Sequence, residues 1–186
     1  MKDKMKANGI FENNVKRQLF GFDFNNKRCL DIGSRDGLNC ITLVNFGAKE
    51  VIGIDLDNTK FHLMPKNNNV KLIKQDLLTY CDKEKFDIIT CFLWNMSAGI
   101  YEDVGKKLVE LLKHNGSVYI SVCDEAYKNP WISSKDINGK TTKIYYDKII
   151  VTKLLERYFN SVDVLNKDDS VQLMIHAYNP INLINK

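Results

Sequence analysis

The chain has 186 residues, the length of one domain, and it can bury a substantial core without disulfides or a structural metal. Hydrophobic residues make up 44% and charged residues 27%, and no apolar run approaches the roughly 18 residues that a transmembrane helix needs. The formal net charge of +4 is too small to indicate a nucleic-acid partner on its own, although it does not oppose an anionic substrate. We therefore expect one soluble domain that has no membrane segment.

The cysteines and the first residues both favour a cytoplasmic protein. Five cysteines form no CxxC pair, and three of them lie inside or beside apolar runs that are typical of strands. We expect them to be core thiols in a reducing compartment. Residues 1–8 are rich in lysine but lead into no apolar segment of the signal-peptide type, so no secretion signal is expected.

Strands and helices alternate through the first half of the chain. Apolar runs rich in β-branched residues predict strands at 28–32, 51–55, 70–75 and 86–93. After the first strand, Leu38, Ile41 and Val44 share one face of a predicted helix that stops at Gly47. A short helical piece is expected near 58–64. This alternation predicts βαβ units around a parallel sheet, the α/β class.

The second half begins with another helix and strand. Val104 and Leu108 mark a helix that is expected to end at Asn115-Gly116, before a fifth strand at 117–122. Residues 124–142 then lose periodicity, which predicts a long surface loop. Such loops on a rigid scaffold often carry function.

A closing hairpin ends the predicted domain. It follows a helix whose apolar face runs from Ile150 to Tyr158, and it consists of strands at 162–165 and 171–178. We expect residues 1–27 to be an N-terminal extension or helix. The remainder, 28–186, is expected to be one domain with a substrate-side loop at about 124–148.

Acidic residues and glycines mark the expected site. Asp31 ends a strand, a glycine-containing loop follows, and a helix comes next, so backbone N–H groups and a positive helix end face a bound ligand. In a doubly wound sheet the ligand lies at the carboxyl ends of the strands. Asp55, Asp76 and residues 93–95 are expected to reach the same edge.

The loop resembles a known family motif. Residues 29–37, Cys-Leu-Asp-Ile-Gly-Ser-Arg-Asp-Gly, are similar to the glycine-rich first motif of class I S-adenosylmethionine-dependent methyltransferases. The dehydrogenase fingerprint GxGxxG does not fit, because Arg35 stands where its second glycine would be. The resemblance spans about residues 28–178. It implies a three-layer Rossmann-like fold with a seven-stranded, mostly parallel sheet whose last strand is antiparallel.

The resemblance also implies which residues bind S-adenosylmethionine, or its product S-adenosylhomocysteine. Asp55, at the end of the second strand, would accept both ribose hydroxyls, and a carboxylate suits that task because it offers only acceptors. Leu56 would pack against the adenine, and Asp76 and Leu77 would contact its amino group and ring. Phe92 and Leu93 would flank the methionine part. The loop itself would contribute Asp31, Gly33, Ser34, Arg35 and Gly37.

Two loop residues leave alternatives open. Arg35 departs from the family's usual glycine, and it would stand near the cofactor carboxylate, project into solvent or weaken cofactor binding. Asp31 would bind the cofactor's amino group, directly or through water, or organise the loop by accepting its N–H groups.

The substrate side is less well defined. Trp94 and Asn95 follow the fourth strand but lack the prolines of enzymes that methylate base amino groups, and Asn95 fits a helix cap equally well. Residues 124–148 interleave lysines with aromatic residues, including Tyr145 and Tyr146. This composition suits nucleic acid or an anionic aromatic ligand, or a solvated loop whose rings pack on the domain. The three histidines are too scattered for a metal site.

The sequence therefore predicts a methyltransferase that acts on a small molecule or an RNA. The alternative is a binding or regulatory module of the same fold that has lost catalysis, which Arg35 favours. A nicotinamide-dependent enzyme is a distant third hypothesis, because the glycine spacing disfavours it. The motifs name no catalytic base, and they leave the oligomeric state open.

Overall fold

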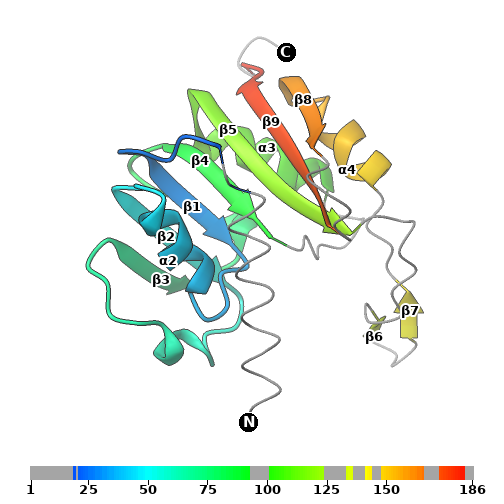
Figure 1. Ribbon diagram of the computed structural model, residues 1–186. Helices are drawn as coiled ribbons and strands as arrows, with labels where there is room; N and C mark the ends of the chain where they lie inside the picture. The colour runs from blue at the N-terminus through cyan, green and yellow to red at the C-terminus, as the bar shows by residue number, and fades with distance from the viewer. Residues whose placement is uncertain are drawn as a thin grey trace.

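The computed structural model describes residues 19, 21–92, 101–123, 133–135, 141–143, 148–165 and 172–182. Seven strands form one sheet in the order β3-β2-β1-β4-β5-β9-β8. Their bounds are β1 (Arg28–Ile32), β2 (Glu50–Asp55), β3 (Val70–Lys74), β4 (Phe86–Cys91), β5 (Leu112–Cys123), β8 (Phe159–Leu165) and β9 (Gln172–Pro180). Strands β1 to β5 pair in parallel, whereas β9 is antiparallel to both β5 and β8. The predicted mostly parallel sheet with an antiparallel last strand is confirmed (Figure 1).

Helices cover both faces of the sheet and complete the three layers. On one face α2 (Leu38–Asn45) lies over β1, β2 and β3, and on the other lie α3 (Tyr101–Leu111) and α4 (Lys148–Leu155) (Figure 1). Two short 3-10 turns, η1 (Phe61–Leu63) and η2 (Leu77–Thr79), follow β2 and β3. In the part of the chain that is described, no helix combines the length and apolar character that crossing a membrane requires.

The core is divided by the sheet into two clusters. Successive residues of a strand point to opposite faces, so each central strand contributes to both. Leu30, Ile52 and Ile89 pack with α3 and α4, whereas Cys29 and Val51 pack with α2. All of β1 is buried, because strands flank it on both sides and helices cover both faces. This double burial explains why most residues of the central parallel strands are apolar.

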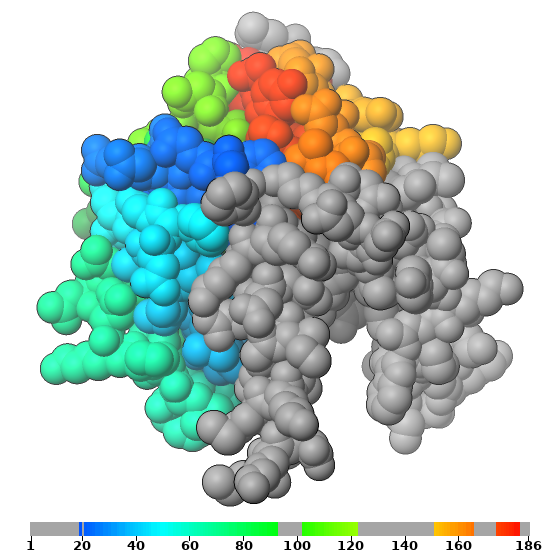
Figure 2. Space-filling view, viewed as in Figure 1, coloured from blue at the N-terminus to red at the C-terminus, as the bar shows by residue number. Residues whose placement is uncertain are grey.

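The residues that precede β1 pack onto the α2 face. Leu19 and Phe24 are fully buried, and the ring of Phe22 lies 4.6 Å from the ring of Tyr119 in β5. Figure 2 shows residues 21–27 as part of a blue band between the cyan α2 layer and the orange and red C-terminal hairpin. The boundary at 27/28 stays a prediction, but the described part of the extension contributes to the core.

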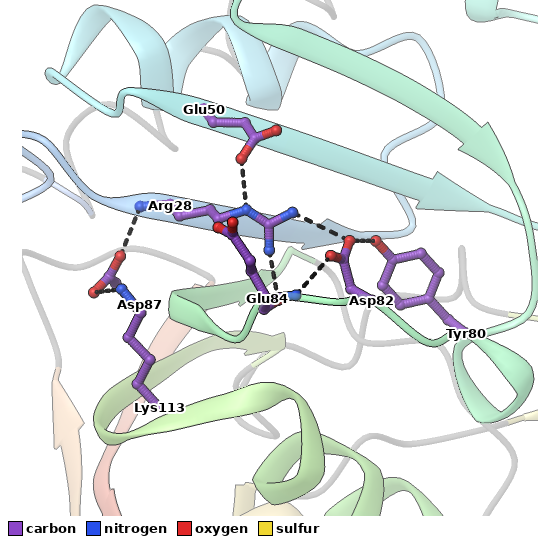
Figure 3. A network of polar contacts seen from close by, with 7 residues as sticks. All are labelled: Arg28, Glu50, Tyr80, Asp82, Glu84, Asp87 and Lys113. Carbon is purple, nitrogen blue, oxygen red and sulfur yellow. Dashed lines mark hydrogen bonds and ion pairs between the residues drawn. The ribbon is translucent and has the colours of Figure 1, made fainter.

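A buried arginine ties together the amino ends of β1, β2 and the segment before β4 (Figure 3). Arg28 Nε donates to Glu50 at 2.5 Å, and its terminal nitrogens donate to the Glu84 carbonyl at 2.7 Å and to Asp82 at 3.1 Å. The guanidinium carbon lies 4.3 Å from the centre of the Phe86 ring. Each guanidinium nitrogen therefore has an acceptor, which offsets the cost of burying the charge.

Two aspartates extend this network. Asp82 also accepts the Tyr80 hydroxyl at 2.6 Å. Asp87 accepts the backbone N–H of Arg28 at 2.9 Å and the ammonium of Lys113 at 2.8 Å. The network lies at the amino end of β1, opposite the carboxyl edge where the site is expected, so its role is to hold the sheet together (Figure 3).

The structure corrects the boundary between α3 and β5. The helix ends at Leu111 and the strand begins at Leu112, so the predicted helix end at Asn115-Gly116 is wrong. The register between β4 and β5 shifts at this point, leaving residues 113–116 as an irregular insertion in the strand. A Cβ on Gly116 would lie 2.8 Å from Leu112 Cδ2. The glycine therefore permits close packing in a bulge and does not stop a helix.

Other predicted boundaries differ by a few residues. β4 ends at Cys91 and not at 93, and the helical piece near 58–64 is the three-residue η1. Within the predicted loop at 124–142, β6 (Ser133–Lys135) and β7 (Thr141–Lys143) form an antiparallel pair. Three-residue strands are too short to show a periodic pattern in the sequence.

Candidate functional site

The loop between β1 and α2 takes its shape from two glycines. Gly33 and Gly37 have φ of 75° and 76°, in the left-handed region that favours glycine. At Gly37 an added Cβ would also lie 2.7 Å from Met64 Sδ, so a larger residue would displace that side chain. At Gly33 an added Cβ would meet no atom within 4 Å. The backbone at Gly33 is therefore open to a close-lying ligand.

The end of β2 holds the loop in place. The carbonyl of Ile54 accepts the N–H groups of Gly33 at 2.9 Å and of Ser34 at 3.1 Å. The carboxylate of Asp55 accepts the N–H of Arg35 at 2.9 Å and, through its other oxygen, the N–H of Asp57 at 2.9 Å. Asp55 is half-buried. Each oxygen keeps lone pairs for further donors, so these bonds do not exclude ribose hydroxyls.

Asp31 is a buried carboxyl without a basic partner in the described residues. It is 0% exposed, and it accepts the Thr90 hydroxyl at 2.8 Å and the Cys40 thiol at 3.6 Å. Burial raises the pKa of Asp31 to about 7, against the opposing effect of these two bonds, and the charges of Asp55 and Asp36 raise it further. The carboxyl accepts two side-chain donors, whereas the N–H groups of Gly33, Ser34 and Arg35 donate to Ile54 and Asp55.

The loop packs closely against Gly53 in β2, a residue that the sequence analysis did not identify as part of the site. A Cβ on Gly53 would lie 2.7 Å from Ser34 Cβ, 2.8 Å from Cys40 Sγ and 2.6 Å from Leu72 Cδ2. Ser34 therefore packs directly over β2, and its buried hydroxyl has no hydrogen-bond partner in the described part of the chain. A glycine inside an apolar strand was the available signal, because it indicates close approach of another group.

The remaining predicted cofactor residues lie at the same edge but differ in exposure. Leu56 is 68% exposed, as a residue that packs against a ligand can be, whereas Leu77 and Phe92 are 6% and 7% exposed. Leu77 is part of the core, so its backbone is the part left for a ligand contact. Asp76 is exposed, and its carboxylate accepts the N–H of Leu78 at 2.9 Å at the start of η2.

The structure thus brings Asp31, Asp55 and Asp76 to one edge, because they stand at or just after the carboxyl ends of adjacent strands β1, β2 and β3. Leu93, Trp94, Asn95, Tyr145 and Tyr146 lie outside the described residues. The three carboxylates at this edge of the sheet suit a ligand that carries hydroxyl donors and positive charge. Open backbone at Gly33 and the exposed side chain of Leu56 suit its neutral parts. These residues fit S-adenosylmethionine, which carries a ribose, an adenine, an ammonium and a sulfonium.

The described residues support neither a metal site nor a catalytic His176. Among them, no three His, Cys, Asp or Glu side chains are grouped in a way that would hold a metal ion. The ring of His176 in β9 stacks on Tyr119 at 4.4 Å with an interplanar angle of 5°. Burial lowers the pKa of His176, although the charge of Asp163 opposes this. The histidine is part of the packing between the N-terminal segment and the C-terminal hairpin.

Comparison with known families and proteins agrees with the resemblance in the motifs. A family model described as a methyltransferase domain matches residues 8–161. The ribosomal protein L11 methyltransferase of Fusobacterium nucleatum is 33% identical over 135 residues, which cover 68% of this chain and 42% of that protein. A 23S rRNA (cytidine-2'-O)-methyltransferase of Campylobacter jejuni is 34% identical over 73 residues, 38% of this chain and 29% of that protein. The chain thus spans less than half the length of these relatives.

Solved structures share the fold. The crystal structure of an S-adenosylmethionine-dependent methyltransferase from Mesorhizobium loti superposes with a TM-score of 0.67 at 14% identity, covering 90% of this chain and 97% of that one. At this identity the similarity shows only that the fold is shared. Membership of the family is shown by the family model that matches residues 8–161.

Proposed function

The chain belongs to the class I methyltransferase family, whose cofactor is S-adenosylmethionine, and from this premise we propose that it methylates an RNA acceptor. The observation that carries the cofactor part of this proposal is the arrangement of the carboxyl edge. There the open backbone of Gly33 lies in a loop held by Asp55, next to the buried carboxyl of Asp31.

We assign the cofactor contacts to residues at this edge. Asp55 would accept the ribose hydroxyls through its remaining lone pairs, Leu56 would cover one face of the adenine, and Asp76 would accept from its amino group. Asp31 is fully buried, so it would bind the ammonium through a water. Carboxylates suit these positions because charge-assisted hydrogen bonds are stronger than neutral ones.

The chemistry demands little of the protein beyond orientation. When bound, S-adenosylmethionine supplies a methyl group that its sulfonium already makes electrophilic. The protein must then hold the acceptor nucleophile in line with that group. Trp94 and Asn95 after β4, and Tyr145 and Tyr146 within 124–148, remain the residues that we propose to border the acceptor.

The composition of segment 124–148 is the observation that favours RNA as the acceptor. The lysines and aromatic residues of segment 124–148 combine charge for a phosphate backbone with rings on which bases stack. One relative is named for an rRNA substrate, whereas another is named for a ribosomal protein. Since relatives named for different substrates match this chain, the match does not define the acceptor. A small molecule is the alternative.

Calorimetry with S-adenosylhomocysteine tests the cofactor site. We expect saturable binding to the wild-type protein and at least a tenfold loss of affinity in Asp55→Ala. Asp57→Ala is the matched control, because Asp57 is an acid of the same β2–η1 segment and, among the described residues, its carboxylate accepts hydrogen bonds from Thr59 alone. Wild-type protein that is folded but does not bind would refute the proposal.

Transfer of a radiolabelled methyl group to a cell extract tests the acceptor. The extract is then separated into RNA, protein and small-molecule fractions. Label in RNA is the expected result, and label only in another fraction would replace RNA with that class of acceptor.

The second candidate function is a module that binds the cofactor without catalysis. Arg35 favours it, because a non-glycine residue with φ of 49° stands in the loop. Cofactor binding together with absence of label from every fraction would support this candidate, and any methylated product would exclude it.

A further inference from the structure

Three successive N–H groups of the loop are held by the end of β2. The first two, from Gly33 and Ser34, donate to the backbone carbonyl of Ile54. The third, from Arg35, donates to the side chain of Asp55 at 2.9 Å. A backbone acceptor is present whatever the side chains are, whereas the acceptor for Arg35 depends on one residue.

Arg35 is the loop residue that most needs such a bond. Its φ of 49° is left-handed, which reduces the population of that conformation for a non-glycine residue by roughly five- to thirtyfold. The other non-glycine residues with positive φ in the described part are asparagines, a type that tolerates this region. The Arg35 side chain is exposed, and its guanidinium has no partner among the described residues. Its backbone bond to Asp55 is thus the contact that opposes the unfavourable φ.

The carboxylate of Asp55 is itself well anchored. Its second oxygen accepts the N–H of Asp57 at 2.9 Å, and its backbone carbonyl accepts the N–H of Gln75 at 2.9 Å. β3 and the turn after β2 therefore orient Asp55 independently of the loop. An acceptor whose position is set elsewhere can impose a conformation on the residue that donates to it.

We propose that Asp55 is the positioning residue of this loop, and that its carboxylate holds Arg35 in the left-handed conformation that keeps the Gly33 backbone open to the cofactor. This inference rests on the proposed function, in which the same carboxylate accepts the ribose hydroxyls. One side chain then couples ribose recognition to loop shape. The coupling arises because this chain has arginine at position 35, since glycine would adopt the same conformation without help.

A double-mutant cycle of Asp55→Asn and Arg35→Gly tests the coupling. Asparagine keeps the size of the side chain but replaces one of the two oxygens by an NH2 donor, so one of the two N–H groups loses its acceptor. The first measurement is hydrogen exchange of the peptide that covers residues 33–37, without ligand. The second is the affinity for S-adenosylhomocysteine by calorimetry. Asp57→Asn is the control, because it removes a neighbouring carboxylate whose hydrogen bonds, in the part of the chain that is described, go to Thr59 and not to the loop.

In the wild-type background, Asp55→Asn is expected to speed hydrogen exchange in the loop and to lower the affinity for S-adenosylhomocysteine. Both effects should be smaller in the Arg35→Gly background, and the loss of affinity should be at least fivefold smaller there. The control should change neither quantity by more than about twofold. An equal effect of Asp55→Asn on loop exchange in both backgrounds would overturn the inference. Wild-type protein that does not bind S-adenosylhomocysteine would instead refute the proposed function, and the exchange measurement would still decide the coupling. If Asp55→Asn folds only in combination with Arg35→Gly, that result itself demonstrates the coupling.

Discussion

Replacing Asp31 by asparagine should stabilise the protein, although Asp31 lies at the centre of the proposed site. Between about pH 4 and pH 7 the folded state holds a proton on this carboxyl, because its pKa is raised to about 7, whereas the unfolded state does not. The unfolded state binds fewer protons in this range, so ionisation of Asp31 makes the free energy of unfolding fall as pH rises. Asparagine has no charge to bury and can still accept the Thr90 hydroxyl.

The magnitude follows from the two pKa values. The difference between 3.8 and about 7 corresponds to about 4 kcal/mol of stability above pH 7. At pH 5 the corresponding gain is roughly 1–2 kcal/mol, because there the folded carboxyl is protonated and the unfolded one is mostly ionised. For a chain of this length, the larger value raises the unfolding temperature by roughly 8–16 °C.

Urea unfolding at pH 5, 6, 7 and 8, followed by circular dichroism, measures this effect. The stability difference between Asp31→Asn and wild type should grow with pH up to about 7 and then level off. Asp103→Asn is the control, because Asp103 is exposed on α3. A difference that is zero, or that is the same at pH 5 and pH 8, would refute the reasoning. Under the proposed function the same variant loses affinity for S-adenosylhomocysteine, a trade of stability against function.

Two further predictions concern the parts that hold the site. Arg28→Ala leaves Glu50, Asp82 and the Glu84 carbonyl without their donor. We expect the free energy of unfolding, measured in urea, to fall by about 3–5 kcal/mol. Arg157→Ala, which removes an exposed ion pair, should cost less than about 1 kcal/mol, and equal losses would contradict a special role for the buried arginine. The added methyl group in Gly53→Ala forces apart the side chains packed over β2. We expect the free energy of unfolding, measured by thermal unfolding, to fall by about 1–3 kcal/mol. An unchanged unfolding temperature would contradict this prediction, because it would show that these side chains can move aside without loss of stability.

Much of the architecture could be predicted because it depends on local patterns. The run from Arg28 to Ile32 has three apolar residues, on both faces of the strand, so it was recognisable as a buried parallel strand before its neighbours were known. Gly37 was likewise recognisable as part of the glycine-rich motif, and its φ is positive. The order of strands, glycines and acids along the chain was sufficient to identify the family.

Features that depend on contacts between distant residues could not be predicted in the same way. Asn115-Gly116 has the composition of a helix end, and only the register between β4 and β5 makes it a bulge. Gly53 was visible as a glycine in a strand, but its neighbours Ser34, Cys40 and Leu72 come from three separate segments. Their convergence on one backbone position is a tertiary property.

The sequence by itself determined that a glycine-rich loop with acidic residues lies at the carboxyl edge of a parallel sheet. Periodicity and backbone preferences are local, so they survive without knowledge of the packing. Tertiary structure decided what each acid does. Asp31 is buried against Thr90 and Cys40, and Asp55 holds the backbone of Arg35. The physical reason is that the partner of a carboxylate, and the water around it, depend on segments up to 59 residues apart in the chain.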